Sequence, residues 1–198
     1  MTSPAKRIGV FVCDCGANIA GTVDTEDVAR FAKTLPCVAA VVRNRYTCAD
    51  PGQNEIKKAI VEHGLDRVVV ASCSPKMHEP TFRRCVAEAG LNPYLMEMAN
   101  IREQCSWVHM GDRAAATRKA KDLVRSAVER ARLLEAQDEK TFPVTDAVMV
   151  IGGGVAGIQT ALELAAAGHQ VYLVERQASI GGIMSTLDKT YPTMDCSI

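Results

Sequence analysis

The feature of this sequence that most constrains its fold is a glycine-rich run lying between a strand pattern and a helix pattern. Residues 146–151 (DAVMVI) form a short apolar run typical of a buried strand, and GGGVAG follows at 152–157. An Ala/Leu-rich helix pattern covers 158–167, and a second strand pattern at 171–174 runs into Glu175. This order of strand, G-x-G-x-x-G loop, helix, strand and acid predicts a βαβ unit that binds a dinucleotide.

The spaced glycines have separate roles in such a loop. Gly152 permits the tight turn, Gly154 lets the backbone approach a pyrophosphate, and Gly157 allows the helix to pack closely on the strand. The helix N-terminus offers free N–H groups and a partial positive charge to the phosphates. Glu175 can accept hydrogen bonds from a ribose hydroxyl. The alternative interpretation is a glycine-rich turn in an ordinary βαβ unit.

A second glycine pair, Gly181-Gly182, follows the acid by a few residues. This spacing resembles the two-dinucleotide-binding flavoproteins, such as thioredoxin reductase, in which the corresponding loop lies against FAD. The resemblance therefore favours FAD over NAD. We expect the cofactor-binding residues to be Gly152, Gly153, Gly154, Val155, Ala156, Gly157, Glu175, Arg176, Gly181 and Gly182.

Strand and helix patterns also alternate along the rest of the chain. The strand patterns are 7–12, 38–43 and 67–71, with a weaker one at 94–98, and the first is a continuous apolar run with β-branched residues. The helix patterns are 24–34, 52–63, 81–89 and 114–136. Such alternation predicts a parallel sheet with helices packed on its faces.

The expected fold class is therefore α/β, with a small parallel-sheet N-terminal domain followed by an incomplete Rossmann-like, thioredoxin-reductase-like FAD-binding βαβ unit. The expected boundaries are a cysteine-bearing, cluster-binding domain over 1–136, a linker over 137–145 and a truncated FAD-binding domain over 146–198. The linker is placed there because QDEKTFPVT is polar and contains a proline. A lone β-α-β unit buries few of its faces, so we expect the isolated chain to bind FAD poorly.

Composition narrows the functional classes. Acidic and basic residues balance at 23 each, which gives no electrostatic reason to expect nucleic acid or an anionic membrane as a partner. No apolar run is long enough to span a bilayer, and the start of the sequence lacks the pattern of a secretion signal. We therefore expect a cytoplasmic protein with no nucleic-acid or membrane partner.

Five of the eight cysteines follow the carboxyl ends of predicted strands: Cys13, Cys15, Cys48, Cys73 and Cys105. Because the carboxyl ends of parallel strands meet at one sheet edge, we expect these thiols, distant in sequence, to converge there. Four thiolates suit a [4Fe-4S] cluster or a tetrahedral zinc ion. Buried or redox-sensing thiols are the alternative, since a reducing compartment disfavours disulfides.

Two other cysteines of the same domain have a structural interpretation. Cys37 begins a strand at the opposite edge and Cys85 lies inside a helix, so both are predicted to be buried. A disulfide-exchange function of Cys13 and Cys15 is a weaker alternative, because C-x-C is one residue shorter than the usual C-x-x-C redox motif.

Several stretches together resemble one family, the A-type subunits of heterodisulfide reductase and their relatives, which are iron–sulfur flavoproteins. They are VCDCG at 12–16, YTCADPGQ at 46–53, VVVASCSPKMHEPTFRR at 68–84, NPYLMEMANIREQCSWVH at 92–109, KAKDLVRSAVERARLL at 119–134, VMVIGGGVAGIQTALELA at 148–165, and VERQASIGGIM through LDKTYPTMDCS. The resemblance covers nearly the whole chain, as the N-terminal portion of such a protein, and is more specific than any single motif.

The resemblance implies an oxidoreductase in which FAD exchanges electrons with iron–sulfur clusters, with flavin-based electron bifurcation as one form of that exchange. It implies FAD and a [4Fe-4S] cluster as cofactors. It implies heterodisulfide reductase-like B and C subunits and a hydrogenase or formate dehydrogenase arm as partners, and it allows a homodimer of the full-length form. No catalytic side chain is expected, because the cofactors carry the chemistry. The alternative is a non-catalytic, zinc-bound or metal-free docking module for partner redox subunits.

By the same likeness the candidate metal ligands are Cys13, Cys15, Cys48, Cys73, Cys105 and Cys196. The first five are one more than a cubane cluster needs, and Cys196 resembles a ligand whose companions follow in longer family members. The sequence ends where a second cysteine of a C-S-x-C-like stretch is expected, so we hypothesise a UGA selenocysteine codon at that point. Any other codon there contradicts this hypothesis, and a chosen boundary or a short paralogue is the alternative. The truncated chain alone is expected to be inactive.

Overall fold

The computed structural model describes residues 6–196, and the chain divides into two compact units, Met1–Asp138 and Glu139–Ile198. The hypothesis about the end of the sequence concerns residues 197–198 and the codon beyond them, which lie outside the described range. Within that range, no helix combines the length and the apolar character needed to cross a bilayer.

The first unit is built on four parallel strands in the order β2-β1-β3-β4. The strands are β1 (Ile8–Cys13), β2 (Val38–Asn44), β3 (Arg67–Ser72) and β4 (Met96–Asn100). Every residue of the two central strands β1 and β3 is buried. Strands covered on both faces need continuous apolar runs, which explains why these segments are apolar without alternation.

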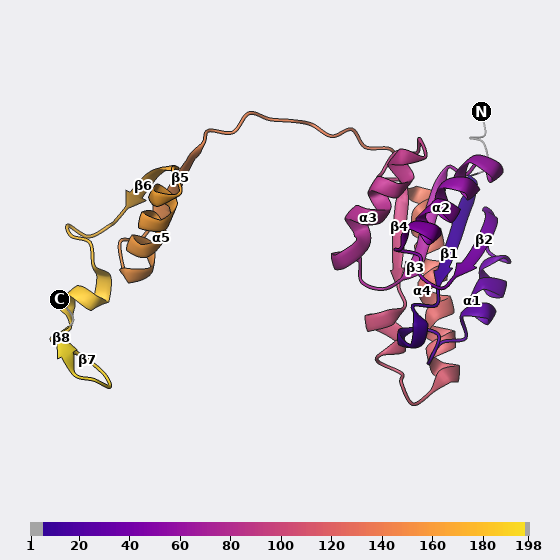
Figure 1. The fold of residues 1–198 in the computed structure, drawn as a ribbon, viewed down its shortest axis with the longest axis horizontal. Coiled ribbons are helices and arrows are strands. Elements are labelled where there is room, and N and C mark those ends of the chain that lie inside the picture. Colours follow the sequence, from indigo (N-terminus) through magenta and orange to yellow (C-terminus); the bar gives the residue numbers. More distant parts are fainter. Residues whose placement is uncertain (1–5, 197–198) are drawn as a thin grey trace. The chain divides into compact units, whose positions relative to one another are not determined.

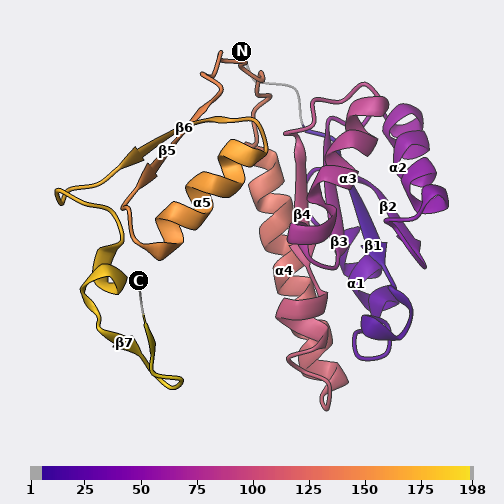
Figure 2. The ribbon, with the colours of Figure 1, turned by 60° about the vertical axis from the view of Figure 1, so that its left-hand side comes forward.

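Helices cover both faces of this sheet (Figures 1 and 2). On one face, α1 (Thr25–Ala32) and α4 (Arg113–Leu133) pack on the side chains of Val10, Val12 and Val69. On the other face, α2 (Asp50–His63) and α3 (Pro75–Glu88) pack on Phe11 and Val70. The first unit is therefore a three-layer α/β sandwich with two separate apolar cores.

Helix α3 begins at Pro75, six residues before the predicted start at Thr81. The sequence prediction excluded Pro80, which in fact lies inside the helix. Pro75 occupies the first turn after Ser74, where a missing N–H costs nothing. The stretch that follows Cys73 is thus helical almost from its beginning.

Strand β4 lies two residues later than the predicted range 94–98, and a π-helical turn follows it at Arg102–Ser106. In that turn Ser106 N–H donates to Ile101 O at 3.1 Å and Trp107 N–H donates to Arg102 O at 2.9 Å. Both bonds span five residues, as a π-helix requires. No sequence pattern predicted this turn.

The second unit contains the predicted βαβ element. Strands β5 (Ala147–Ile151) and β6 (Gln170–Val174) pair in parallel and are connected by α5 (Val155–Ala166). A 3-10 turn at Gly182–Thr186 precedes the short antiparallel pair β7 (Lys189–Thr190) and β8 (Asp195–Cys196). The predicted fold class is confirmed: a parallel-sheet α/β unit is followed by a partial Rossmann-like unit.

The βαβ element leaves much of its apolar surface open within the described residues. Met149 and Ile151 of β5, Leu162 of α5 and Tyr172 of β6 are all more than half exposed. A complete Rossmann half buries such side chains under further strands and helices. This exposure agrees with the expectation that the unit is incomplete.

Candidate functional site

The strand order creates a topological switch point between β1 and β3. From β1 the chain passes through α1 to β2, then crosses through α2 to β3 on the other side of β1. Ligands of open parallel sheets bind in the crevice that opens at the carboxyl ends of the strands at such a point. Cys13 is the last residue of β1, and Cys73 follows the last residue of β3.

Four thiols meet at this crevice: Cys13, Cys15, Cys48 and Cys73, which we call the four-cysteine site. Cys13 and Cys73 are each 3% exposed, and the other two are half-buried. Burial raises the pKa of Cys15 and of Cys48, and the neighbouring Cys13 raises both further. Burial raises the pKa of Cys73 to about 11, and the other three cysteines add to the effect. This mutual influence means that the four sulfurs lie close enough to act on one another.

Polar contacts fix the loop that carries Cys13 and Cys15. Asp14 between them accepts hydrogen bonds from Thr25 Oγ1 at 2.6 Å and from Arg43 Nε at 2.9 Å. Cys15 adopts a left-handed backbone conformation with φ of 46°, which turns the chain sharply after the strand. The two cysteines are therefore held by β2 and α1 as well as by their own strand.

A backbone N–H group also approaches one of the sulfurs. Thr47 N–H donates to Cys13 Sγ at 3.4 Å, from the loop that follows β2. In iron–sulfur proteins, N–H···S bonds of this kind stabilise negative charge on the thiolates and adjust the reduction potential. The loop that places Cys48 thus contacts the sulfur of Cys13 directly.

Gly52 fixes the loop that carries Cys48. It lies in the first turn of α2, and a Cβ atom there would overlap the carbonyl oxygen of Tyr46 and come within 2.6 Å of Thr47 Cα. Backbone cannot move aside cheaply, so only glycine allows α2 to begin this close to the cysteine loop.

We expect Gly52→Ala to reduce the free energy of unfolding by about 1–3 kcal/mol, because the new methyl group would overpack against the loop. Thermal unfolding followed by circular dichroism measures the effect. Gly111→Ala is the matched control, since its Cβ would meet no atom within 4 Å. Equal stabilities of the two variants would contradict the close packing described here.

Arg102 is a member of this site that sequence reasoning missed. It follows β4 by two residues, and its guanidinium lowers the pKa of the Cys73 thiol against the larger effect of burial. It also lowers the pKa of Cys15 and of Cys48, again opposing burial. Residues that directly follow parallel strands gather at one edge of the sheet. Arg102 follows the fourth strand in this way, so the rule that pointed to the cysteines could also have pointed to it.

The structure does not bring Cys105 to the other four. Cys105 is fully buried, and its Sγ donates to Ala116 O of α4 at 3.0 Å. Its side chain belongs to the core between the sheet and α1 and α4, and burial raises its pKa to about 11. The π-helical turn that contains it directs the thiol toward α4 rather than toward the crevice.

Cys37 and Cys85 also lie away from the four-cysteine site, and Cys196 belongs to the second unit. Cys196 is exposed in β8 of the second unit. Cys85 is fully buried in α3, where its Sγ donates to Gln53 O at 3.4 Å. Cys37 is partly buried in a left-handed conformation with φ of 64° and packs against the α1/α4 core.

The spacing of the four thiols can be compared with two kinds of metal centre. Within residues 6–196, no three His, Cys, Asp or Glu side chains lie close enough to hold one metal ion. A cubane cluster is bound through four separate irons, so its sulfur ligands lie further apart than those of a single ion. Two buried donors near the carboxyl ends of β3 and β4, Ser72 Oγ and Arg102 Nε, have no hydrogen-bond partner in the protein. Four thiols are the number and type of ligand that an iron–sulfur cubane takes.

In the second unit, the glycine loop adopts the geometry that its sequence predicted. Gly152 has φ of 104° and its N–H donates to Val174 O at 2.8 Å. A Cβ on Gly157 would overlap the carbonyl oxygen of Gly152, so the start of α5 lies directly against the loop. A Cβ on Gly154 would meet no atom within 4 Å, which leaves open space beside the loop. Val155 and Ala156 form the first turn of α5.

Glu175 anchors this loop through its carboxylate. Its Oε2 accepts from Gly153 N–H at 2.7 Å and its Oε1 accepts from Gln177 N–H at 2.8 Å. These backbone N–H groups, that of Gln177 first, hold the pKa of Glu175 below its usual value, with a smaller contribution from Arg176. The acid that follows β6 is therefore adjacent to the glycine loop, and backbone N–H groups hold both of its carboxylate oxygens.

The second glycine pair lies against the first loop. Gly181 N–H donates to Gly153 O at 2.7 Å, and Gly154 and Gly181 form a parallel bridge. A Cβ on Gly182 would lie 3.0 Å from Gly154 Cα, and both glycines of the pair have positive φ. Two loops that are 27 residues apart at Gly154 and Gly181 thus form one glycine-lined surface beside the N-terminus of α5.

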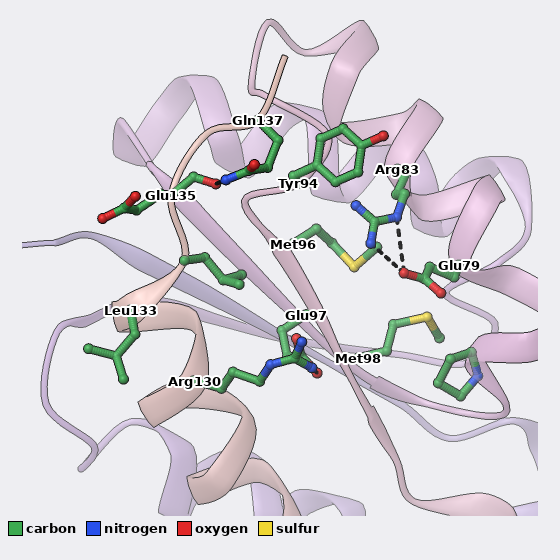
Figure 3. Close-up of a pocket in the computed structure, with 12 residues that line it drawn as sticks. Glu79, Arg83, Tyr94, Met96, Glu97, Met98, Arg130, Leu133, Glu135 and Gln137 are labelled. Carbon is green, nitrogen blue, oxygen red and sulfur yellow. Dashed lines mark hydrogen bonds and ion pairs between the residues drawn. The ribbon is translucent and has the colours of Figure 1, made fainter. Parts of the chain in front are cut away.

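A groove of about 490 Å³ lies apart from the cysteines, beside the edge strand β4 (Figure 3). Two pairs of its charged side chains interact: Arg83 Nε donates to Glu79 at 3.0 Å, and Arg130 donates to Glu97 at 2.9 Å. Arg83 also lies over the Tyr94 ring, with its guanidinium carbon 4.6 Å from the ring centroid. The groove contains no cysteine among its lining residues, so it does not carry the chemistry of the four-cysteine site.

Comparison with known proteins first defines the class of the second unit. Residues 147–193 match the family described as FAD dependent oxidoreductase. This match covers β5, the glycine loop, α5, β6 and the second glycine pair. The fold and this match define a protein class in which a segment similar to FAD dependent oxidoreductases follows a cysteine-bearing α/β unit.

Comparison over the whole chain then identifies the family. The chain is 62% identical over 198 residues to an A-type iron-sulfur subunit of the CoB–CoM heterodisulfide reductase of Methanopyrus kandleri, and it covers 30% of that protein. It is 60% identical over 197 residues to the A-type subunit of the H2:CoB-CoM heterodisulfide,ferredoxin reductase of Methanothermobacter thermautotrophicus, again covering 30%. It is 55% identical over 192 residues to the A-type subunit of the H2/formate:CoB-CoM heterodisulfide,ferredoxin reductase of Methanococcus maripaludis, covering 29%.

The chain belongs to the family of heterodisulfide reductase A-type subunits, as the sequence resemblance predicted. It spans about 30% of the length of these relatives, and an N-terminal portion fits this extent.

Proposed function

We propose that this chain is part of the electron-transfer subunit of a heterodisulfide-reductase-like complex. In this proposal the glycine loops hold FAD and the four-cysteine site holds a [4Fe-4S] cluster, and electrons pass between them. The observation that supports it best is the gathering of Cys13, Cys15, Cys48 and Cys73 at the topological switch point of the first sheet. The names of the relatives, one of which is an iron-sulfur subunit, support the same assignment.

The residues of the chain have separate roles in this proposal. The four thiolates would bind the cluster, while Thr47 N–H and Arg102 stabilise their negative charge. Gly152, Gly154 and Gly157 would admit the pyrophosphate of FAD, and Gly181-Gly182 would lie along the same ligand. Residues 137–145 would connect the two domains. The flavin supplies two-electron and one-electron chemistry, and no acid–base side chain is required.

The finer parts of the proposal rest on the names of the relatives. Reductases that act on both heterodisulfide and ferredoxin suggest that the flavin divides an electron pair between two acceptors. Those names also suggest an electron input from hydrogen or formate, and thus partner subunits of the hydrogenase or formate dehydrogenase type. Heterodisulfide-reducing B and C subunits and a homodimer of the full-length form complete the assembly that we propose.

Metal and flavin analysis of the chain purified without oxygen tests the proposal. We expect about four iron atoms and about four acid-labile sulfides per chain, with broad visible absorbance, as a [4Fe-4S] cluster requires. We expect little bound FAD, because the βαβ unit leaves its apolar faces open. Zinc without sulfide or visible absorbance would instead support the second candidate, a zinc-bound docking module. A protein without metal after anaerobic reconstitution would exclude the cluster assignment.

A further inference from the structure

One backbone N–H group at the four-cysteine site donates to a sulfur atom. Thr47 is fully buried, and its backbone nitrogen lies 3.4 Å from Cys13 Sγ. The next residue is Cys48, so the residue that contacts one candidate ligand leads directly into another. A neutral thiol is a weak hydrogen-bond acceptor, whereas a thiolate is a strong one. The contact at Thr47 is therefore weak in the metal-free protein, and it strengthens when Cys13 binds a metal as a thiolate.

The Thr47 side chain is held by a second set of hydrogen bonds that leads to α2. Thr47 Oγ1 donates to Asn44 Oδ1, and Asn44 Nδ2 donates to Glu55 Oε2 at 2.9 Å. Asn44 is the last residue of β2, and Glu55 is an exposed residue of α2. A relay of side chains therefore runs from a surface carboxylate to the buried residue whose N–H contacts the sulfur.

The backbone of Asn44 gives this relay a fixed base. Asn44 O accepts from Asp14 N–H at 2.9 Å, and the next carbonyl, Arg45 O, accepts from Cys15 N–H at 2.9 Å. The loop after β2 is thus bonded along its length to the loop after β1. A rotation that turned Thr47 N–H away from the sulfur would also pull Thr47 Oγ1 from Asn44 and leave a buried hydroxyl without its acceptor, which is unfavourable. The hydroxyl therefore keeps the N–H directed at the sulfur.

We propose that Thr47 is a positioning residue: its buried hydroxyl, bonded to Asn44, holds its own N–H against Cys13 Sγ and thereby raises the reduction potential of the cluster. The inference rests on the proposed function. One-electron reduction adds one negative charge to the cluster and its sulfur ligands, and no proton is transferred. An N–H donor stabilises the reduced form more than the oxidised form, because the acceptor sulfur carries more negative charge. The loop that supplies Cys48 as a ligand thus also adjusts a second ligand, Cys13.

Potentiometric titration of the anaerobically reconstituted full chain tests this inference. Dithionite supplies the electron, and electron paramagnetic resonance reports the reduced cluster. With Thr47→Val, which replaces the hydroxyl by a methyl group, we expect the ratio of reduced to oxidised cluster at a fixed potential to fall about fivefold. Thr47→Ser keeps the hydroxyl and should stay within about twofold of the unaltered chain. Exchange of the Thr47 N–H for an ester oxygen, introduced as the α-hydroxy analogue of threonine, removes the donor itself and should lower the ratio about tenfold, which is 59 mV for a one-electron couple.

Thr117→Val is the matched control. Thr117 is also a buried threonine, and its hydroxyl donates to Arg113 O at 2.7 Å and accepts from Asp24 N–H at 3.0 Å. These bonds join α4 to the residue that caps α1, rather than the two cysteine loops. This variant should lose stability as Thr47→Val does, but its reduction potential should not change.

Amide hydrogen exchange in the metal-free chain provides a second measurement that needs no cluster. The Thr47 amide, followed by nuclear magnetic resonance, should exchange at least about tenfold faster in Thr47→Val than in the unaltered chain or in Thr47→Ser, because the hydroxyl no longer holds it. Equal protection in the three chains would overturn the positioning role of the hydroxyl.

The outcomes separate this inference from the proposed function. An unchanged potential in Thr47→Val with full iron content would overturn the role of the hydroxyl and leave the cluster assignment intact. Equal shifts in Thr47→Val and Thr117→Val would also overturn it, since lost stability alone would then explain the shift. Loss of iron in Thr47→Val but not in Thr47→Ser, with native circular dichroism, would support it, and loss in both would overturn it. Absence of iron from the unaltered chain is the failure of the proposed function itself.

Discussion

Replacing Cys73 with serine is expected to remove the iron–sulfur cluster, whereas replacing Cys105 with alanine is expected to leave it bound. Cys73 lies at the switch point, 3% exposed, and is influenced by Cys13, Cys15, Cys48 and Arg102. A cubane cluster uses one thiolate for each iron, so the loss of one ligand reduces iron content to below about one-tenth, or leaves an unstable three-iron centre. The alanine at position 105 removes only a core thiol and its bond to Ala116 O.

The control is informative because three of the buried thiols have pKa values raised in the same way by burial. Burial raises the pKa of Cys73, Cys85 and Cys105 alike to about 11. The pKa alone therefore does not distinguish a metal ligand from a core thiol. The two are distinguished by the residues that surround each thiol. Cys85 is influenced by Lys57 and Glu88, and Cys105 by Lys119, whereas Cys73 is influenced by other cysteines. Metal uptake by a thiol of raised pKa releases a proton, so cluster assembly should be faster at higher pH.

Iron and sulfide content after anaerobic reconstitution measures the effect, and urea unfolding measures stability. We expect Cys105→Ala to keep full iron content while losing about 1–2 kcal/mol of unfolding free energy, from the lost hydrogen bond and buried volume. Cys85→Ser serves as a second buried-cysteine control with unchanged iron. The reverse pattern, with iron lost in the Cys105 variant and retained in the Cys73 variant, would show that the ligand set proposed here is wrong.

Much of this site could be predicted because the sequence shows where the buried strands of a parallel sheet end. The apolar runs that became β1 and β3 end directly before Cys13 and Cys73, and a parallel arrangement brings such ends to one edge. The roles of Gly152 and Gly157 could also be predicted from the sequence. Gly152 has a positive φ and Gly157 lies against the backbone of Gly152, and both situations favour glycine strongly over other residues.

The parts that were not predicted depend on side-chain direction rather than on order along the chain. Cys105 follows β4 as Cys73 follows β3, but a π-helical turn rotates its thiol into the core beside α4. A π-helical turn is only one residue wider than an α-helical turn, and a turn this short does not change the periodicity of apolar residues in the sequence. Arg102 was missed because a lone arginine after a strand is typical of a surface charge, and only its buried Nε and the stacking on Trp107 reveal otherwise.

The largest effects in the second unit are expected from two glycine substitutions. Gly157→Ala should reduce the stability of the unit, and Gly154→Ala should reduce its affinity for FAD. At Gly157 the added Cβ would overlap the carbonyl oxygen of Gly152, so Gly157→Ala should destabilise the βαβ unit by about 3 kcal/mol or more. At Gly154 the added Cβ meets no atom, and the backbone φ of −75° suits alanine. Gly154→Ala should therefore change stability by less than about 0.5 kcal/mol. It should still weaken FAD binding at least about tenfold, because the methyl group occupies the space through which the pyrophosphate approaches.

FAD affinity is best measured where the remaining strands of the domain are present. A full-length chimaera, in which residues 146–198 replace the matching segment of the Methanothermobacter thermautotrophicus relative, provides them, once its own binding of FAD is established. Fluorescence titration with FAD and thermal unfolding then separate the two variants: Gly154→Ala loses affinity at constant stability, and Gly157→Ala loses both. The expected loss of affinity depends on the empty space beside Gly154 being the phosphate path, with Gly181-Gly182 as its opposite wall. If Gly154→Ala binds FAD as tightly as the unaltered chimaera, that space is not used by the cofactor, and the dinucleotide must lie on another side of the loop.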